Sequence, residues 1–317
     1  MKIYVIAVLL TVLFSFIGSG IYTAFYSPEV RFWKNAIDQK IDYLENLDRT
    51  EPVFFFVGGS SCAFSVDPTQ LSDRFGIQAV NLGLHAGAGR ALQLEVALQR
   101  IKSGDVLVIA FETSFWYEKD PFKSSALGSQ LYFASPRLRE TGPAIRKLGV
   151  EPGWKPIDLR PGGYHLVTAG LKALLGSPPY RYKSTDIREG GLILYSQDLI
   201  QATPYVGDAE SKITDTARSF LRKIVSYATE NEFEVVVSFP WQFTDSDCLS
   251  KKRDANAELL RCISEICPVL MDPSYGAQDE PQFFSDTFWH LTARGVKLRT
   301  TRIGDGILAW MARGRTE

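Results

Sequence analysis

Residues 52 to 64 read PVFFFVGGSSCAF, and this stretch decides the fold class. A run of apolar and aromatic residues that ends in two glycines is typical of a strand buried on both faces. Two adjacent hydroxyls, Ser60 and Ser61, follow the glycines directly. The pattern predicts a strand that leaves the core through a tight turn into a helix. The serines are then either candidate nucleophiles or caps of that helix.

The same alternation continues along the chain. Apolar runs at 78–84, 105–112, 233–241 and 268–273 predict four further buried strands. Helical spacing of apolar residues predicts helices between them, over 65–76, 89–105, 213–232 and 252–266, and a last helix from residue 292. Strands that alternate with helices favour an α/β domain with a central parallel sheet.

The amino-terminal segment differs from the rest of the chain. No charged residue occurs from Ile3 to Pro28, and the core of this segment reads IYVIAVLLTVLFSFI. Because a spanning helix needs about 20 apolar residues, we expect a transmembrane anchor over 1–26. A signal peptide cleaved near Gly18 to Gly20 is the alternative. Apolar residues at helical spacing over 27–50 predict a helix that links this segment to the domain.

The domain itself is expected to cover 51–317. Its middle, about 119–208, loses the strand and helix rhythm and is rich in Gly, Pro, Ser and Tyr. We interpret this part as an insertion with short helices that covers the sheet edge or the mouth of a pocket.

Bulk composition excludes some classes of protein. With 35 basic and 36 acidic residues, the net charge of −1 gives no field for binding nucleic acid. Three histidines without paired spacing predict no metal site, and no motif calls for a cofactor. Cys248 and Cys262 are a candidate disulfide pair if the compartment is oxidising; free buried thiols are the alternative.

Three short blocks carry the candidate chemistry. GGSS follows the first strand, NLGLHAGAG includes the second, and SDTFWHL lies near the carboxyl terminus. In this order the blocks resemble the SGNH (GDSL-like) hydrolase superfamily, in particular its membrane-anchored members that modify the cell envelope and its polysaccharides. The resemblance covers roughly 50–118 and 232–312. It implies a flavodoxin-like three-layer α/β/α fold and a serine nucleophile.

The resemblance assigns roles residue by residue. Ser60 matches the nucleophile, with Ser61 as the alternative, and His290 matches the base. Asp286, four residues earlier, is expected to share a helical face with His290 and to orient its ring. The backbone N–H groups of Ser60 and of Ala86 or Gly87 match the oxyanion donors.

The third block departs from the family pattern, because Glu112 stands after the third strand where an Asn is usual. Glu112, His85 and Arg90 are candidate substrate-binding residues, and Arg90 is a candidate partner for the Glu112 carboxylate. Basic residues of the last helix are expected on a solvated face: Arg294, Lys297, Arg299 and Arg302.

The function that these features imply is an exported serine esterase or O-acyltransferase. It would act on acyl esters, such as O-acetyl groups, of an envelope polysaccharide through an acyl-Ser60 intermediate. The resemblance places the domain on the periplasmic side of a bacterial inner membrane, with a multi-pass acyltransferase as a partner. The alternative is a catalytically impaired scaffold or glycan-binding subunit of a membrane assembly. A nucleotide-binding domain is disfavoured because GGSS lacks the lysine of a phosphate loop.

Overall fold

The computed structural model describes residues 2–123, 125–139, 144–155, 170–172, 174–176, 180–195, 202–207 and 210–314. The strands are β1 (Phe54–Val57), β2 (Ala79–Asn81), β3 (Val106–Ile109), β4 (Glu234–Val237), β5 (Gln242–Phe243) and β6 (Ala277–Gln278). The helices named below are α1 (Lys2–Ile21), α2 (Pro28–Asn46), α3 (Ser60–Ala63), α4 (Pro68–Phe75), α5 (Arg90–Leu98), α6 (Ser114–Tyr117), α7 (Ala126–Ala134), α9 (Asp215–Glu230), α10 (Leu249–Ser264) and α11 (Ala293–Gly314).

The central sheet has four parallel strands in the order β2-β1-β3-β4. The prediction of an α/β protein with a central parallel sheet is therefore confirmed. The predicted fifth strand is reduced to one parallel bridge, from Val269 to Val237 at the outer edge of β4. Beyond the carboxyl end of β4 the chain forms the small parallel pair β5-β6, which the sequence pattern did not predict.

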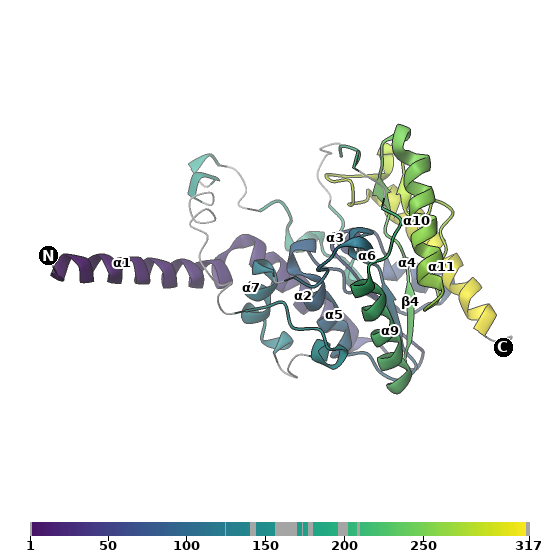
Figure 1. Ribbon diagram of the computed structural model, residues 1–317, viewed down its shortest axis with the longest axis horizontal. Helices are drawn as coiled ribbons and strands as arrows, with labels where there is room; N and C mark the ends of the chain where they lie inside the picture. Colours follow the sequence, from purple (N-terminus) through teal and green to yellow (C-terminus); the bar gives the residue numbers. More distant parts are fainter. Residues whose placement is uncertain are drawn as a thin grey trace.

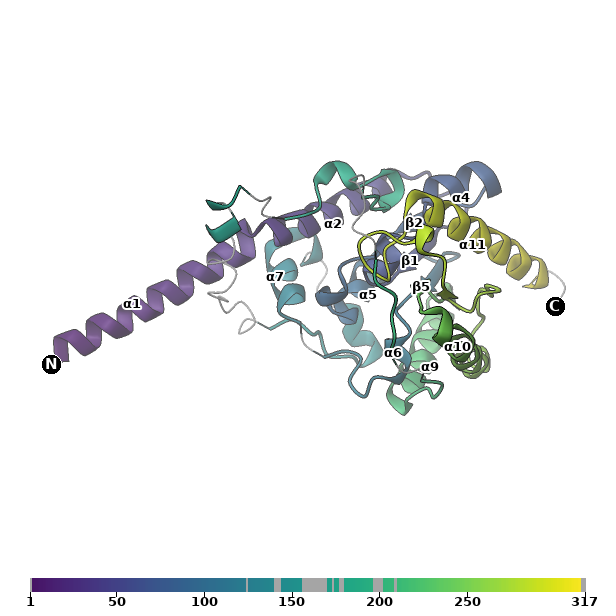
Figure 2. The same cartoon turned by 90° about the horizontal axis from the view of Figure 1, so that it is seen from above.

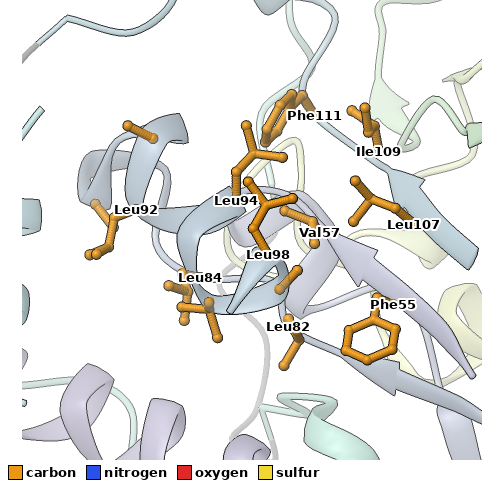
Figure 3. Packing of buried hydrophobic residues seen from close by; sticks show 14 of the residues in the cluster. Phe55, Val57, Leu82, Leu84, Leu92, Leu94, Leu98, Leu107, Ile109 and Phe111 are labelled. Atoms are coloured by element: carbon orange, nitrogen blue, oxygen red, sulfur yellow. The ribbon is translucent and has the colours of Figure 1, made fainter. Parts of the chain in front are cut away.

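Helices cover both faces of the sheet, because successive strand residues point to opposite sides. Phe55 and Val57 of β1 pack in a cluster with α2, α5, α9 and α10. Phe54 and Phe56 pack on the other side with α4 and α11. Figure 3 shows the first of these faces, where leucines of α5 lie beside side chains of β1 and β3 and of the segment that follows β2.

Helix α2 belongs to the core of the domain. Trp33, Ile37 and Ile41 are fully buried along one face of α2, in the same cluster as the sheet. The residues expected to form a linker helix thus contribute buried apolar surface, which stabilises the fold in proportion to its area.

Helix α1 extends away from the domain, as Figures 1 and 2 both show. Its apolar side chains are exposed; Ile3, for example, retains 80% of its accessible surface and Phe14 retains 67%. Among the residues that the structure describes, no helix meets the length and hydropathy needed to span a bilayer. The prediction of a transmembrane helix is therefore not supported.

The middle segment contributes short helices that pack beside α2, on the sheet face that Phe55 and Val57 occupy. Helix α7 packs against α2 and against the short 3-10 turn η2 (Ala86–Ala88). Parts of 119–208 lie outside the described residues, including 156–169 and 196–201.

The basic residues of α11 are not all solvated. Arg299 is 2% exposed and pairs with Asp272, so the prediction of a solvated face is wrong for this residue. Its guanidinium also donates to the Ser238 hydroxyl, 2.9 Å away. The four cysteines are free, and Cys248 and Cys262 form no disulfide.

Candidate active site

The turn after β1 packs so closely on the next segment that a side chain at Gly58 would meet backbone atoms, and one at Gly59 would displace a carboxylate. A Cβ atom on Gly58 would lie 2.2 Å from the carbonyl oxygen of Ala110, and one on Gly59 would lie 2.0 Å from Oε1 of Glu112. Both contacts are too short for real atoms, and both come from the segment that follows β3. The turn that holds the serines therefore packs directly on the end of β3.

The structure distinguishes the two serines. The hydroxyl of Ser61 is fully buried and donates a 2.8 Å hydrogen bond to Oε1 of Glu112. Ser60 stands at the first position of α3 and is 8% exposed. Its hydroxyl has no hydrogen-bond partner among the described residues. Ser60 is consequently the hydroxyl that remains available to a substrate.

Asp286 and His290 form a hydrogen-bonded pair. Nδ1 of His290 lies 2.8 Å from Oδ1 of Asp286, as the spacing of four residues predicted. The expected helical turn is absent from this segment: the two residues lie in a loop closed by an antiparallel bridge between Phe284 and Leu291. The loop backbone is fixed further by the N–H of His290, which donates to the Thr287 hydroxyl at 3.1 Å.

Two residues of the middle segment hold the second oxygen of Asp286. Nη1 of Arg181 lies 2.7 Å from Oδ2 and the hydroxyl of Tyr182 lies 2.8 Å from it. Burial alone would raise the pKa of Asp286, but hydrogen bonds and charge from His290, and hydrogen bonds from Arg181 and Tyr182, hold it well below its usual range. Asp286 is therefore ionised. No spacing motif marks Arg181 or Tyr182 in the sequence, so the sequence alone did not reveal them.

His290 lies against the short helix that begins with Ser60. Its ring stacks on Phe64, with centroids 4.0 Å apart and planes 11° apart. The N–H of Phe64 donates to the carbonyl of Ser60 at 3.0 Å, so these residues are separated by one helical turn and share a face of α3. Since Nδ1 faces Asp286, Nε2 is the ring nitrogen left for a proton from Ser60. No hydrogen bond joins Ser60 and His290 in the described structure, and such bonds often close only when a substrate is bound.

Asn81, the first residue of the second block, holds the helix that contains the two serines. Nδ2 of Asn81 donates to the carbonyls of Cys62 at 2.9 Å and Val66 at 2.8 Å, and Oδ1 accepts from the N–H of Gly83. The carbonyl of Asn81 in turn accepts from Nζ of Lys40 at 2.7 Å. Burial lowers the pKa of Lys40 to about 7. Asn81 therefore fixes α3 in place.

The predicted oxyanion donors fall into two groups. The N–H of Gly87 donates to Nδ1 of His85 at 2.9 Å, so of the two alternatives in this block Gly87 is the one whose N–H is already engaged. The N–H groups of Ser60 and Ala86 make no hydrogen bond within the described residues. His85 is partly buried, and burial lowers its pKa; by accepting from the N–H of Gly87 it fixes the conformation of this loop.

Arg90 does not contact Glu112. Its guanidinium pairs with Glu118 at 2.5 Å and donates to the hydroxyl of Ser114 and the carbonyl of Pro121. The expected pairing of Arg90 with the Glu112 carboxylate is therefore wrong, because Glu118 on the loop after α6 occupies the guanidinium.

A cavity of about 480 Å³ opens beside Glu112, at the carboxyl ends of the sheet strands; its lining does not include Ser60, Asp286 or His290. Glu112 lies in its wall, next to the serine turn through the bond to Ser61. Other parts of the lining come from the second block, the loop before His290, β5 and the middle segment: Ala86, Gly87, Gly89, Arg90, Ser114, Tyr117, Glu118, Pro121, Lys123, Ser125, Tyr205, Gln242, Phe288 and Trp289. Parallel α/β sheets bind ligands at this edge, where strand order reverses, and here β1 and β3 flank that point.

No protein-family model matches the chain, and no curated protein is similar to it at a significant level.

Proposed function

We propose that this protein is a serine esterase or O-acyltransferase that works through an acyl-Ser60 intermediate. The observation that carries the proposal is the Asp286–His290 pair, which is stacked on Phe64 one turn from Ser60. The strand order β2-β1-β3-β4, continued by the bridge at Val269, fits the flavodoxin-like order 2-1-3-4-5 that SGNH-type hydrolases have. The resemblance of the three sequence blocks supports the same proposal.

The proposed reaction has two steps. Nε2 of His290 takes the proton of Ser60 as Oγ bonds to the acyl carbon. The ester C–O bond then breaks and His290 returns the proton to the leaving alcohol. In the second step water or a sugar hydroxyl attacks the acyl-Ser60 ester, loses its proton to His290, and releases Ser60 when His290 protonates Oγ. Ionised Asp286 stabilises the imidazolium in both steps, and the N–H groups of Ser60 and Ala86 are the oxyanion donors.

The proposal includes a location and partners. Exposed apolar side chains cover α1, and a continuous apolar surface of this kind marks a site of contact with lipid or protein. We place the domain at the periplasmic face of a bacterial inner membrane, held there through α1. The substrate is an acylated envelope polysaccharide, and a multi-pass acyltransferase supplies the acyl group where transfer occurs; both rest on the family resemblance.

A fluorophosphonate probe tests the chemistry, because it labels only an activated serine. We expect the wild-type protein to be labelled, Ser60→Ala to lose all labelling, and Ser61→Ala to retain it. Ser61→Ala is the matched control, since it removes a neighbouring hydroxyl and the bond to Glu112 but leaves Ser60. Labelling that survives in Ser60→Ala would assign the nucleophile elsewhere.

One observation favours a second function, that of a non-catalytic glycan-binding subunit. The Glu112 carboxylate lies against Gly59 and Ser61, beside the place where an oxyanion would form, and its charge would oppose that oxyanion. Absence of probe labelling in the folded wild-type protein, from mild acid to mild base, would support this function and refute the esterase.

A further inference from the structure

The cavity beside the serine turn contains a buried polar group without a partner. Gln242, at the start of β5, lines the cavity and is 2% exposed. Its Oε1 is buried and accepts no hydrogen bond. Because an unsatisfied buried acceptor costs free energy, this atom needs a donor, which a ligand or an ordered water in the cavity can supply.

Glu112 adds a second acceptor to the same cavity. It is 6% exposed, and the one hydrogen bond that its carboxylate accepts within the described structure comes from Ser61 to Oε1. Oε2 accepts none from these residues. Oε1 of Gln242 and Oε2 of Glu112 are thus two acceptors in the lining of one cavity. A ligand hydroxyl could donate a hydrogen bond to either of these oxygens.

Aromatic side chains form another part of the lining. Tyr117, Tyr205, Phe288 and Trp289 are all partly buried, and the Tyr205 and Phe288 rings pack on each other with centroids 5.4 Å apart. Flat apolar faces next to polar acceptors suit a sugar ring, which has apolar C–H faces and a polar edge. The volume of about 480 Å³ lies within the range of small-ligand sites, about 300–1,000 Å³.

The charges in the cavity balance. Arg90 is neutralised by Glu118, and the single charge of Glu112 is matched by Lys123. No arginine of the lining is left to pair with a carboxylate or phosphate of the ligand, because Arg90 is the arginine of this lining and Glu118 holds it. With Arg90 paired to Glu118 and the charge of Lys123 opposed by that of Glu112, the described lining carries no net positive charge that would favour an acidic sugar.

We propose that this cavity binds a neutral sugar ring of the polymer, with Oε1 of Gln242 as acceptor for a ring hydroxyl. The inference rests on the proposed function for its link to acyl chemistry, but the binding itself does not require a reactive Ser60. Gln242 is thus a specificity-determining residue, and uronate or phosphorylated sugars are disfavoured.

Ligand-detected saturation-transfer NMR on the full chain in detergent tests the inference. The probes are the methyl glycosides of glucose, galactose, mannose and N-acetylglucosamine, compared with the methyl glycosides of glucuronic and galacturonic acid. We expect at least one neutral glycoside to bind more tightly than either uronate. Tighter binding of a uronate, or no binding by any neutral glycoside, would overturn the inference.

Variants at two glutamines make the test specific. Gln242→Leu is expected to weaken binding of the bound neutral glycoside about fivefold, the effect of one neutral hydrogen bond. The matched control is Gln278→Leu on the adjacent strand β6. Gln278 is also buried with an unpartnered amide atom, but it does not line the cavity. Equal affinity of Gln242→Leu and wild type, with both folded by thermal denaturation, would refute the role of Gln242.

The same samples separate this inference from the proposed function. Ser60→Ala should bind the neutral glycoside as the wild type does while losing probe labelling. If the wild type binds the glycoside but is never labelled, the acyl chemistry fails and the binding site stands. If it is labelled but binds no neutral glycoside, the esterase stands and the binding inference fails.

Discussion

Replacement of Asp286 by Asn tests the central pair, because the two carboxylate oxygens have different partners. Oδ1 faces His290, while Oδ2 accepts from both Arg181 and Tyr182. An asparagine has one oxygen, and two donors on the far side draw it toward Arg181 and Tyr182. The amide NH2 then faces Nδ1 of His290, which must give up its proton and become an acceptor. Nε2 is left protonated and cannot act as the base.

The expected loss is large. A serine hydrolase with the orienting carboxylate changed to an amide loses about 10⁴-fold in rate through the same tautomer error. We therefore expect the second-order rate of fluorophosphonate labelling of Asp286→Asn to fall by about 10³- to 10⁴-fold, which is about 4–5.5 kcal/mol of activation free energy.

Tyr182→Phe provides the graded control. It removes one neutral donor to Oδ2, together with a hydroxyl 3.2 Å from Nδ1 of His290, and it leaves the Arg181–Asp286 and Asp286–His290 bonds, so we expect a fall of about five- to tenfold. Labelling of Asp286→Asn within about tenfold of the wild type, with its melting temperature preserved, would refute the role given to Asp286. A loss in Tyr182→Phe as large as in Asp286→Asn would show that Tyr182 does more than hold the carboxylate.

Two further predictions concern stability and location. Asp272→Asn leaves the buried guanidinium of Arg299 without its carboxylate and should cost about 3–5 kcal/mol in denaturant unfolding. Burial raises the pKa of Asp272, but the charge of Arg299 and hydrogen bonds from Ser274 and Trp241 outweigh it, so the net pKa in the folded state is lowered. The wild type should therefore lose stability as pH falls below about 4, more steeply than Asp272→Asn; equal slopes would contradict the pairing. Deletion of residues 1–21 should abolish co-flotation with phosphatidylethanolamine–phosphatidylglycerol vesicles, and flotation that survives the deletion would place the lipid contact elsewhere.

The sheet could be predicted from the sequence because its strands are apolar runs bounded by glycines and charges. β1 to β4 lie within the predicted ranges, and helices cover both faces as the helical spacing indicated. β5 and β6 could not be predicted, since each has two residues and no period can be recognised over that length.

The site could be predicted only where the chemistry lies in local motifs. The four-residue spacing of Asp286 and His290 indicated their hydrogen bond correctly, although a loop and not a helix brings them together. Contacts between distant segments left no local signal. Arg181 and Asp286 are 105 positions apart in the sequence. The loop after α6 brings Glu118, and not Glu112, to the guanidinium of Arg90.

The glycine patterns predicted where the backbone turns, but they did not predict which backbone N–H groups are left without a hydrogen bond. The pair Gly58–Gly59 predicted the turn after the first strand correctly, and the structure shows that Ala110 and Glu112 lie close against this turn. The block around Gly87 predicted a free N–H, but the ring of His85 lies close enough to accept it. Which acceptor reaches a given N–H depends on side-chain rotamers, which sequence spacing does not specify.

The helical path from α1 into the core has a mechanical consequence. α1 is followed by the π-helical turn η1 (Tyr22–Tyr26), then by the single residue Ser27, and then by α2, which is wedged against the sheet. Ser27 is itself buried and its carbonyl accepts from the N–H of Arg31, so no slack tether separates the two helices. The surface that α1 binds therefore determines both the distance of the cavity from that surface and its orientation relative to it. Under the proposed function, this connection would restrict the protein to esters that lie within one narrow range of distances from that surface.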